Sequence, residues 1–251
     1  MPDLLARYEY KYLIDEATAS GIRDVVQSYL EVDPYGDNGA YWVNSLYLDT
    51  FDWRLARQTI DGVKNRFKLR MRCYEFDDTP VFCENKGRVG TTIIKTRALC
   101  RREDAEAIAM NSVRPETSLV AAKKHHQEDL DRFRNLVDRI DARPRLWVRY
   151  HREAWVSPFG DGARLTFDRR LQCQVPSEPV FKPDLRWFHP IGLAKPTILE
   201  MKFNGASPHW MRNLVRWFNL RRLSVAKYVS GALEIGNFPF NDTVEHGARI
   251  G

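Results

Sequence analysis

Polar and apolar residues alternate along several short stretches of the chain, a two-residue period that is typical of β-strands with one buried face. The alternation predicts about eight strands, each bounded by turn residues or by a change of period. These strands cover residues 7–14, 41–48, 63–76, 81–88, 91–100, 145–155, 162–171 and 197–203. Most of them are joined by short turns rich in Pro, Gly and Asp, so we expect hairpins and an antiparallel arrangement.

Four regions instead repeat their apolar residues with the 3.6-residue period of a helix. Asp15 caps the first helix, and residues 101–140 form the second helical region. Ser207 and Pro208 begin the third helix in the favoured order of cap and proline, and Ser224 caps the last. Because these helices do not alternate regularly with strands, the pattern indicates an α+β fold around an antiparallel sheet or barrel.

The length and composition favour one globular domain. The chain has 251 residues, of which 43% are hydrophobic, so it can bury a sizeable core and is not disordered throughout. We expect the core to span residues 7–235, with a proline-rich ordered loop at 176–196 and a loose tail at 236–251. No apolar run reaches the ~18 residues of a transmembrane helix, and the first residues do not resemble a secretory signal.

Charge and cysteine content narrow the class of partner and compartment. The formal net charge is +6, with 39 Lys and Arg against 33 Asp and Glu, which points to an anionic partner. The four cysteines form no CxxC pair, so neither a disulfide scaffold nor a zinc site is indicated. We interpret them as free thiols in a reducing cytoplasm.

The cations are concentrated on single faces of the predicted strands. Arg66, Lys68, Arg70 and Arg72 occupy successive positions on one face of the third strand, and apolar residues occupy the other. The same parity recurs in other strands and groups Glu9 with Lys11, Glu84 with Lys86 and Arg88, Lys95 with Arg97, Tyr150 with Arg152, Arg164 with Thr166 and Asp168, and Glu200 with Lys202.

A one-sided sheet with its charged face in water would explain any single strand. It does not explain the whole set, because four adjacent cations repel one another unless an anion lies between them. If the apolar faces pack outward against helices, about ten cations line an interior. Burying so many unpaired charges costs several kcal/mol each, so this interior is expected to bind a polyanion, with Arg forks on phosphate oxygens.

Four carboxylates share the cationic faces, namely Glu9, Glu84, Asp168 and Glu200. Carboxylates repel a phosphate chain, so we interpret them as ligands of a divalent cation that bridges phosphate oxygens. The alternative for each is a salt bridge to a neighbouring Lys or Arg, and for Glu84 the two interpretations weigh equally.

Lys227 stands in the first turn of the last predicted helix, at the end of the helix dipole that disfavours a cation. A bound anion at this helix end would compensate, because backbone N–H groups and Lys227 could bind the same phosphate. A solvent-exposed lysine is the alternative.

Seven motifs, in order from about Arg7 to Leu233, resemble the VTC domain, the polyphosphate polymerase domain of the vacuolar transporter chaperone complex. This domain belongs to the triphosphate tunnel metalloenzymes, with the CYTH proteins as relatives. The motifs are Arg7-Tyr8-Glu9-Tyr10-Lys11-Tyr12, Ser45-Leu46-Tyr47-Leu48-Asp49-Thr50, Lys68-Leu69-Arg70-Met71-Arg72-Cys73-Tyr74, Glu84-Asn85-Lys86, Tyr150-His151-Arg152-Glu153-Ala154, Leu199-Glu200-Met201-Lys202-Phe203 and Ala226-Lys227-Tyr228.

The resemblance implies a closed antiparallel β-barrel of about eight strands that forms a cation-lined tunnel. It implies an ATP-dependent polymerase that moves the γ-phosphate of ATP onto a growing polyphosphate chain with Mn²⁺ or Mg²⁺. By position, the phosphate-binding residues are Lys11, Arg70, Arg72, Lys86, Arg152, Arg164, Lys202 and Lys227, with Lys95 as a further member. Arg66 and Lys68 join them as substrate-binding residues from their strand face.

The resemblance also implies the metal ligands. Glu200 matches the ligand position of the family, and Glu9 matches the second Glu of the ExExK motif of the wider superfamily. Arg7 stands where that motif has its first Glu, so a single main metal held by Glu200 and phosphate oxygens fits better than paired N-terminal carboxylates.

Two other functions remain open from the sequence. A tunnel enzyme that passes the γ-phosphoryl group to water is a triphosphatase, and a cationic interior without turnover is a polyphosphate-binding module. Nucleic acid is not expected as a partner, because the cation-bearing strand faces carry few aromatic residues for base stacking.

Overall fold

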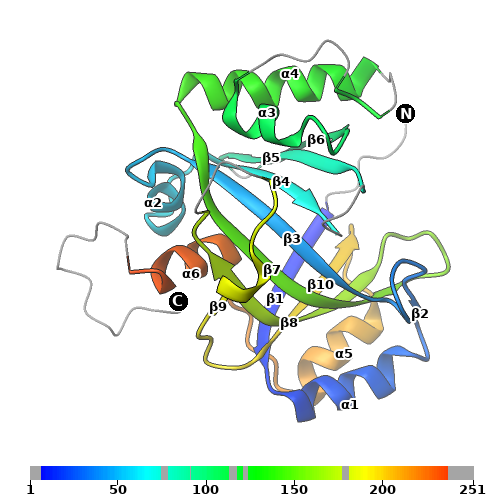
Figure 1. The fold of residues 1–251 in the computed structure, drawn as a ribbon. Helices are drawn as coiled ribbons and strands as arrows, with labels where there is room; N and C mark the ends of the chain where they lie inside the picture. Colours follow the sequence, from blue (N-terminus) through cyan, green and yellow to red (C-terminus); the bar gives the residue numbers. More distant parts are fainter. Residues whose placement is uncertain are drawn as a thin grey trace.

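The computed structural model describes residues 7–74, 79–90, 92–112, 118–120, 124–176 and 181–236 (Figure 1). Several predicted segments lie partly outside the described residues: the last two residues of the strand predicted at 63–76, part of the turn at 77–80, the first residue of the strand at 91–100, part of the loop at 176–196 and nearly all of the tail at 236–251. The described residues therefore cover most of the core expected at 7–235.

One antiparallel sheet organises the described residues, in the order β1-β10-β8-β7-β3-β4-β5-β6. Two short strands, β2 (Glu31–Val32) and β9 (His189–Pro190), pair with β7 and β8. The main strands are β1 (Arg7–Ile14), β3 (Ala40–Asp49), β4 (Arg66–Cys73), β5 (Val81–Val89), β6 (Thr92–Cys100), β7 (Arg143–Val156), β8 (Arg164–Gln174) and β10 (Thr197–Asn204). The alternation in the sequence therefore predicted all eight main strands, with ends that differ by a few residues.

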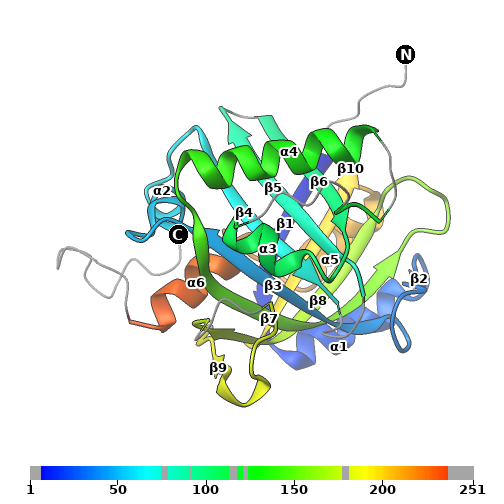
Figure 2. The same cartoon turned by 45° about the horizontal axis from the view of Figure 1, so that its top comes forward.

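The sheet curls into an open half-barrel, so the expectation of a closed barrel was wrong (Figure 2). Strands β1 and β6 end the order, and no backbone pairing joins them within the described residues. The outer edge of β6 is met instead by Leu119, which forms a bridge with Cys100. Side chains span the concave side, where the Lys86 ammonium lies 3.4 Å from the Glu9 carboxylate.

Two helical layers cover the convex face of the sheet (Figures 1 and 2). Helices α3 (Ala105–Met110) and α4 (Lys124–Arg139) pack on β3 to β6. Helices α1 (Glu16–Val26) and α5 (His209–Trp217) pack on β1, β8 and β10. Both helical layers pack against the apolar sides of the strands. The charged sides therefore face the concave interior, as the sequence predicted.

A third apolar cluster closes one part of the concave side. Helices α2 (Arg54–Ile60) and α6 (Lys227–Glu234) pack there against inward residues of β3, β7 and β8. The Tyr228 ring stacks on Tyr47 at 4.4 Å, and its hydroxyl donates to Asp49 at 2.7 Å. This packing fixes the start of α6, and with it Lys227, beside the charged face.

Three helical predictions need correction, and one helix was not predicted. Helix α5 begins at His209 after Pro208 and has no side-chain cap, so Ser207 is not its cap. The region at 101–140 contains two described helices, α3 and α4, rather than one continuous pattern. Helix α6 begins after Ala226 without a side-chain cap, so Ser224 is not the cap. Helix α2 was not predicted, because its capping carboxylate, Asp49, lies five residues before the helix and accepts from the N–H groups of Leu55 and Ala56. None of the helices in the described residues is long and apolar enough to cross a membrane.

Candidate active site

The predicted cations converge on the concave face from seven strands and from α6. Twelve basic side chains and five carboxylates gather there, so the basic groups outnumber the acidic ones by seven. The cations are Lys11, Arg66, Lys68, Arg70, Arg72, Lys86, Lys95, Arg97, Arg152, Arg164, Lys202 and Lys227, and the carboxylates are Glu9, Asp33, Glu84, Asp168 and Glu200. The face is therefore partly neutralised by the protein itself and retains a strong positive excess.

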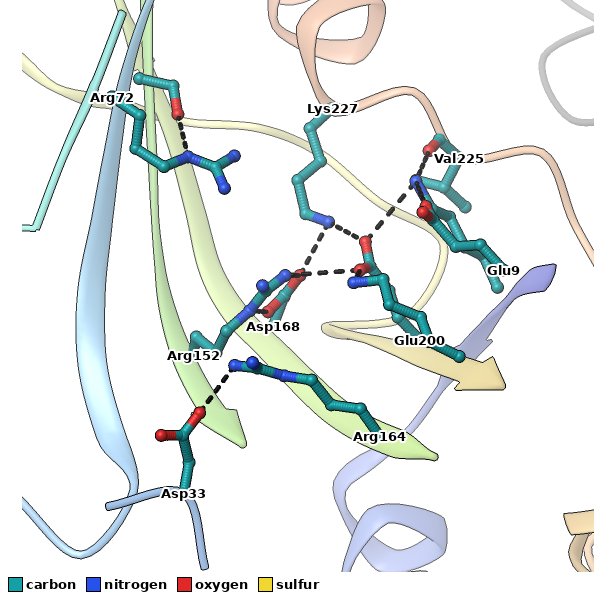
Figure 3. A network of polar contacts seen from close by, with 12 residues as sticks. Glu9, Asp33, Arg72, Arg152, Arg164, Asp168, Glu200, Val225 and Lys227 are labelled. Carbon is teal, nitrogen blue, oxygen red and sulfur yellow. Dashed lines mark hydrogen bonds and ion pairs between the residues drawn. The ribbon is translucent and has the colours of Figure 1, made fainter. Parts of the chain in front are cut away.

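Glu200 lies at the centre of one half of this face, 4% exposed and surrounded by four cations (Figure 3). Its Oε1 accepts from Lys227 Nζ at 2.6 Å and lies 3.5 Å from Lys11 Nζ. Its Oε2 accepts from Lys202 Nζ at 2.8 Å and from Arg152 Nη2 at 3.4 Å. Burial alone would raise the pKa of Glu200, but these cations outweigh it and hold the pKa well below its usual range.

Asp168 fixes two of the same cations from the neighbouring strand β8. It accepts a bidentate pair from Arg152 at 2.6 and 2.7 Å, and Lys227 Nζ lies 2.7 Å from its Oδ2. The Tyr150 ring lies 5.2 Å from the Arg152 guanidinium and 4.8 Å from Lys227 Nζ. The anion expected at the start of the last helix is therefore supplied by Asp168 and Glu200.

Glu9 connects β1 with β5 across the concave face. Its carboxylate lies 3.1 Å from Lys11 Nζ and 3.4 Å from Lys86 Nζ. Burial would raise the pKa of Glu9, yet these lysines outweigh it and lower the pKa to about 2. Burial lowers the pKa of the nearby Lys202 to about 8, although Glu200 opposes the change. Glu9 is thus ionised, and Lys202 titrates near neutral pH.

Glu84 is the centre of a second group of cations on β4, β5 and β6. The Arg70 Nε donates to its carboxylate at 2.7 Å, with Lys95 at 3.2 Å, Arg97 at 3.3 Å and Arg72 at 3.9 Å. Glu84 is 1% exposed, and although burial opposes it, the four cations lower its pKa far below normal. This geometry favours the ion-pair interpretation of Glu84 over the metal-ligand one.

Two predicted cations carry charge that the described carboxylates do not match. Lys68 has no carboxylate within ion-pair distance in the described part of the chain. Burial, with Lys11, Lys86 and two further cations, lowers the pKa of Lys68 to about 7. Among the described residues, the polar contacts of Arg72 are the 3.9 Å approach to Glu84 and a hydrogen bond from Nε to Ser45 Oγ at 3.3 Å. Both side chains therefore suit an incoming anion.

Arg66 and Arg164 lie at opposite ends of the charged face. Arg66 donates to the Val63 carbonyl at 2.6 Å. Arg164 donates to Asp33 at 2.7 Å and to the Tyr41 hydroxyl at 2.9 Å. Every predicted site residue is thus on the concave face, although Arg66 and Arg164 lie at its rims.

Two residues of the charged face, Arg97 and Asp33, were not among the predicted site residues. Arg97 shares its strand parity with Lys95, so the signal was present in the sequence. Asp33 gave no signal, because it lies in the loop after β2 and reaches Arg164 only in the folded chain.

The donor groups around Glu200 suit a divalent cation that arrives with a phosphate substrate. No group of three His, Cys, Asp or Glu side chains in the described ranges could hold a metal alone. Mg²⁺ commonly uses one or two carboxylates plus substrate oxygens and water. Glu200 and Glu9 are ionised and share Lys11. Thr166, paired in register with Glu200, is fully buried, and its hydroxyl has no hydrogen-bond partner among the described residues.

Together, these features define a curled antiparallel domain with a polycationic concave face. The model of the VTC domain family matches residues 6–234. The chain therefore belongs to the VTC domain family.

One solved structure shares the fold at low sequence identity, and a second is similar over most of the chain. A putative adenylyl cyclase from Hippeastrum, HpAC1, described as having a dominant triphosphatase activity, is 13% identical with a TM-score of 0.51. The alignment covers 91% of this chain and 96% of that one. The PH1819 protein from Pyrococcus horikoshii OT3 is 11% identical with a TM-score of 0.46, over 92% of this chain and 99% of that one. The comparison with curated proteins gave no match.

Proposed function

We propose that this protein is an ATP-dependent polyphosphate polymerase that transfers the γ-phosphate of ATP onto a growing polyphosphate chain on the concave face. The observation that carries the proposal is that twelve basic side chains face five carboxylates there, and that one of them, Lys68, has no described carboxylate partner. A linear polyanion can neutralise such a surface over its whole length, whereas a small monovalent anion cannot. Membership of the VTC domain family supports the same substrate class.

To catalyse phosphoryl transfer, a protein mainly has to position the reacting phosphates and compensate their negative charge. Arg72 and Arg70 come from one wall, and Lys202 and Arg152 from the other, so phosphates between them are held from both sides. Rigid strands keep these donors in place, which favours in-line alignment of donor and acceptor phosphates. Charge that develops on the transferred group is then stabilised by preorganised cations.

Glu200 and Glu9 are the residues that would hold Mn²⁺ or Mg²⁺, with phosphate oxygens completing the ligand set. A divalent cation there would neutralise charge on the bridging phosphate oxygens. The lysines that now contact these carboxylates, Lys11 and Lys202, would then donate to phosphate. Their long flexible stems allow this exchange of partners.

The first test is incubation of the purified protein with ATP and Mn²⁺, followed by separation of the products by length. The proposal expects a polymer of phosphate and release of ADP. Free phosphate without polymer would indicate a triphosphatase, the activity named for the Hippeastrum protein of similar fold. Unchanged ATP together with tight binding of polyphosphate would indicate a binding module.

A matched pair of variants ties the product to the concave face. Arg72→Ala removes a cation whose nearest ion-pair contact among the described residues is 3.9 Å long, and Arg212→Ala removes an exposed arginine on α5, a helix of the convex face. Polymer formation should be lost in the first and kept in the second. Equal activity in both variants would contradict the assignment of the site.

A further inference from the structure

Four aromatic side chains gather at the end of the concave face where β3 begins and β4 ends. They come from separate segments: Tyr35 precedes β3, Tyr41 lies in β3, Tyr74 directly follows β4, and Phe82 lies in β5. Ring centroids are 4.9 Å apart for Tyr35 and Tyr41, 5.0 Å for Tyr35 and Tyr74, and 6.0 Å for Tyr74 and Phe82. We call these four residues the aromatic cluster.

The aromatic cluster is open to water at Tyr35. This side chain is 44% exposed, whereas Tyr41 beneath it is 7% exposed. The loop that carries Tyr35 is held by Asp33, which accepts from the Tyr35 backbone N–H at 3.0 Å and pairs with Arg164 at 2.7 Å. The exposed Tyr35 ring thus packs against the buried Tyr41 ring. Through Asp33, the loop that carries Tyr35 is also linked to Arg164 on the charged face.

Cations alternate with these rings. The Arg97 guanidinium lies 3.6 Å from the centroid of Phe82, and Arg72 is paired in register with Phe82. Arg164 donates to the Tyr41 hydroxyl at 2.9 Å. Rings interleaved with guanidinium groups stack on nucleobases and hold the attached phosphates. The faces of single strands did not reveal this arrangement, because Tyr35 and Tyr74 lie outside the strands.

We propose that the aromatic cluster binds the nucleobase of a nucleoside triphosphate, with its phosphates on Arg72 and the cations beyond it. This inference rests on the proposed function, because it places the base of the phosphate donor. A stacked base is recognised by its π-face, so every base should bind similarly. ATP and GTP should therefore bind alike, and both should bind more tightly than tripolyphosphate under conditions that equalise their charge.

The test compares ATP, GTP and tripolyphosphate for wild type, Tyr35→Ala and Tyr35→Trp by calorimetry. Tyr35→Ala should weaken ATP and GTP binding between about 5-fold and about 150-fold, the usual range for one lost stacking partner. Tripolyphosphate affinity should not change, and Tyr35→Trp should retain nucleotide affinity. Trp217→Ala is the matched control, because Trp217 is 61% exposed on α5, away from the concave face. A thermal melt of each variant checks folding.

The outcomes separate this inference from the proposed function. Equal losses for ATP and tripolyphosphate, or no loss for either, would overturn the nucleobase site while leaving a phosphate site in place. Wild type that binds neither ligand would overturn the proposed function and the nucleobase site together. A single-stranded oligonucleotide without a triphosphate should bind weakly. If it binds as tightly as ATP and depends on Tyr35, the cluster serves nucleic acid and the inference is wrong.

Discussion

Replacing Lys68 with Met should stabilise the free protein, because Lys68 carries a charge that the fold does not compensate. In the folded chain its pKa falls from 10.5 to about 7, through burial first and then through Lys11, Lys86, Arg66 and Arg70. At ~1.4 kcal/mol for each tenfold change in proton affinity, full protonation costs roughly 5 kcal/mol of stability. At pH 8, where Lys68 is mostly neutral in the folded protein, the cost is roughly 3 kcal/mol.

The sign of the pH dependence follows from proton binding. The unfolded chain keeps the Lys68 proton up to pH 10.5, and the folded protein loses it near pH 7. Between these values the unfolded state binds more protons, so the stability of wild type rises with pH through this window. Water around this half-buried amine screens part of the effect, so we expect Lys68→Met to add about 1–3 kcal/mol at pH 8 and almost nothing near pH 10.5.

Denaturant unfolding of wild type, Lys68→Met and Lys64→Met from pH 6 to pH 10.5 measures this effect. Lys64 is an exposed lysine just before β4 and serves as the control for removing one charge. Calorimetry of tripolyphosphate binding at pH 8 in two buffers should show proton uptake by wild type and less by Lys68→Met. A stabilisation that is absent, or constant across this pH range, would refute the reasoning.

Three further results are expected. Arg72→Ala should lower turnover by about 30- to 1000-fold, the effect of one lost electrostatic donor, with an unchanged melting temperature, and a normal rate would remove Arg72 from the site. Glu200→Gln should destabilise the free protein by about 3–5 kcal/mol, because four cations lose their shared buried counter-charge. The turnover rate of Glu200→Gln should stay low at any Mn²⁺ concentration. Equal rates for this variant and wild type at equal Mn²⁺ would exclude Glu200 as a ligand. Tripolyphosphate affinity should fall steeply with salt, and a flat response would contradict a polycationic site.

The sequence was sufficient to predict the strands and the composition of the charged face. Alternation in a strand has a period of two, so the cations at 66, 68, 70 and 72 had to share one face wherever β4 lay in the sheet. The apolar residues between them had to meet helices, and they do so through α3 and α4. Which face was interior was therefore a local property of each strand.

Three features could not be predicted in this way, because they depend on contacts between residues that are distant in the sequence. They are the open edge between β1 and β6, the helix α2 and the ion pair between Asp33 and Arg164. Whether β1 pairs with β6 is decided by the curl of the whole sheet, and the chain near Leu119 meets the edge of β6 instead. Asp49 caps α2 from outside the usual capping position. The ion pair between Asp33 and Arg164 joins residues 131 positions apart. No periodicity contains such information.

The partners of each carboxylate indicate which of them can change role when substrate arrives. Asp168 accepts hydrogen bonds from the rigid guanidinium fork of Arg152, and the closest contact of Glu84 is Arg70. If either carboxylate turned to a metal ion, a planar guanidinium group would lose its acceptor. Glu200 and Glu9 are held mainly by lysines, whose ammonium groups can turn on flexible stems toward a phosphate. Phosphate that draws these lysines away leaves two ionised carboxylates in need of a cation, which is the condition for binding Mn²⁺ or Mg²⁺. Substrate and metal are therefore expected to bind together, each creating the charge that the other compensates.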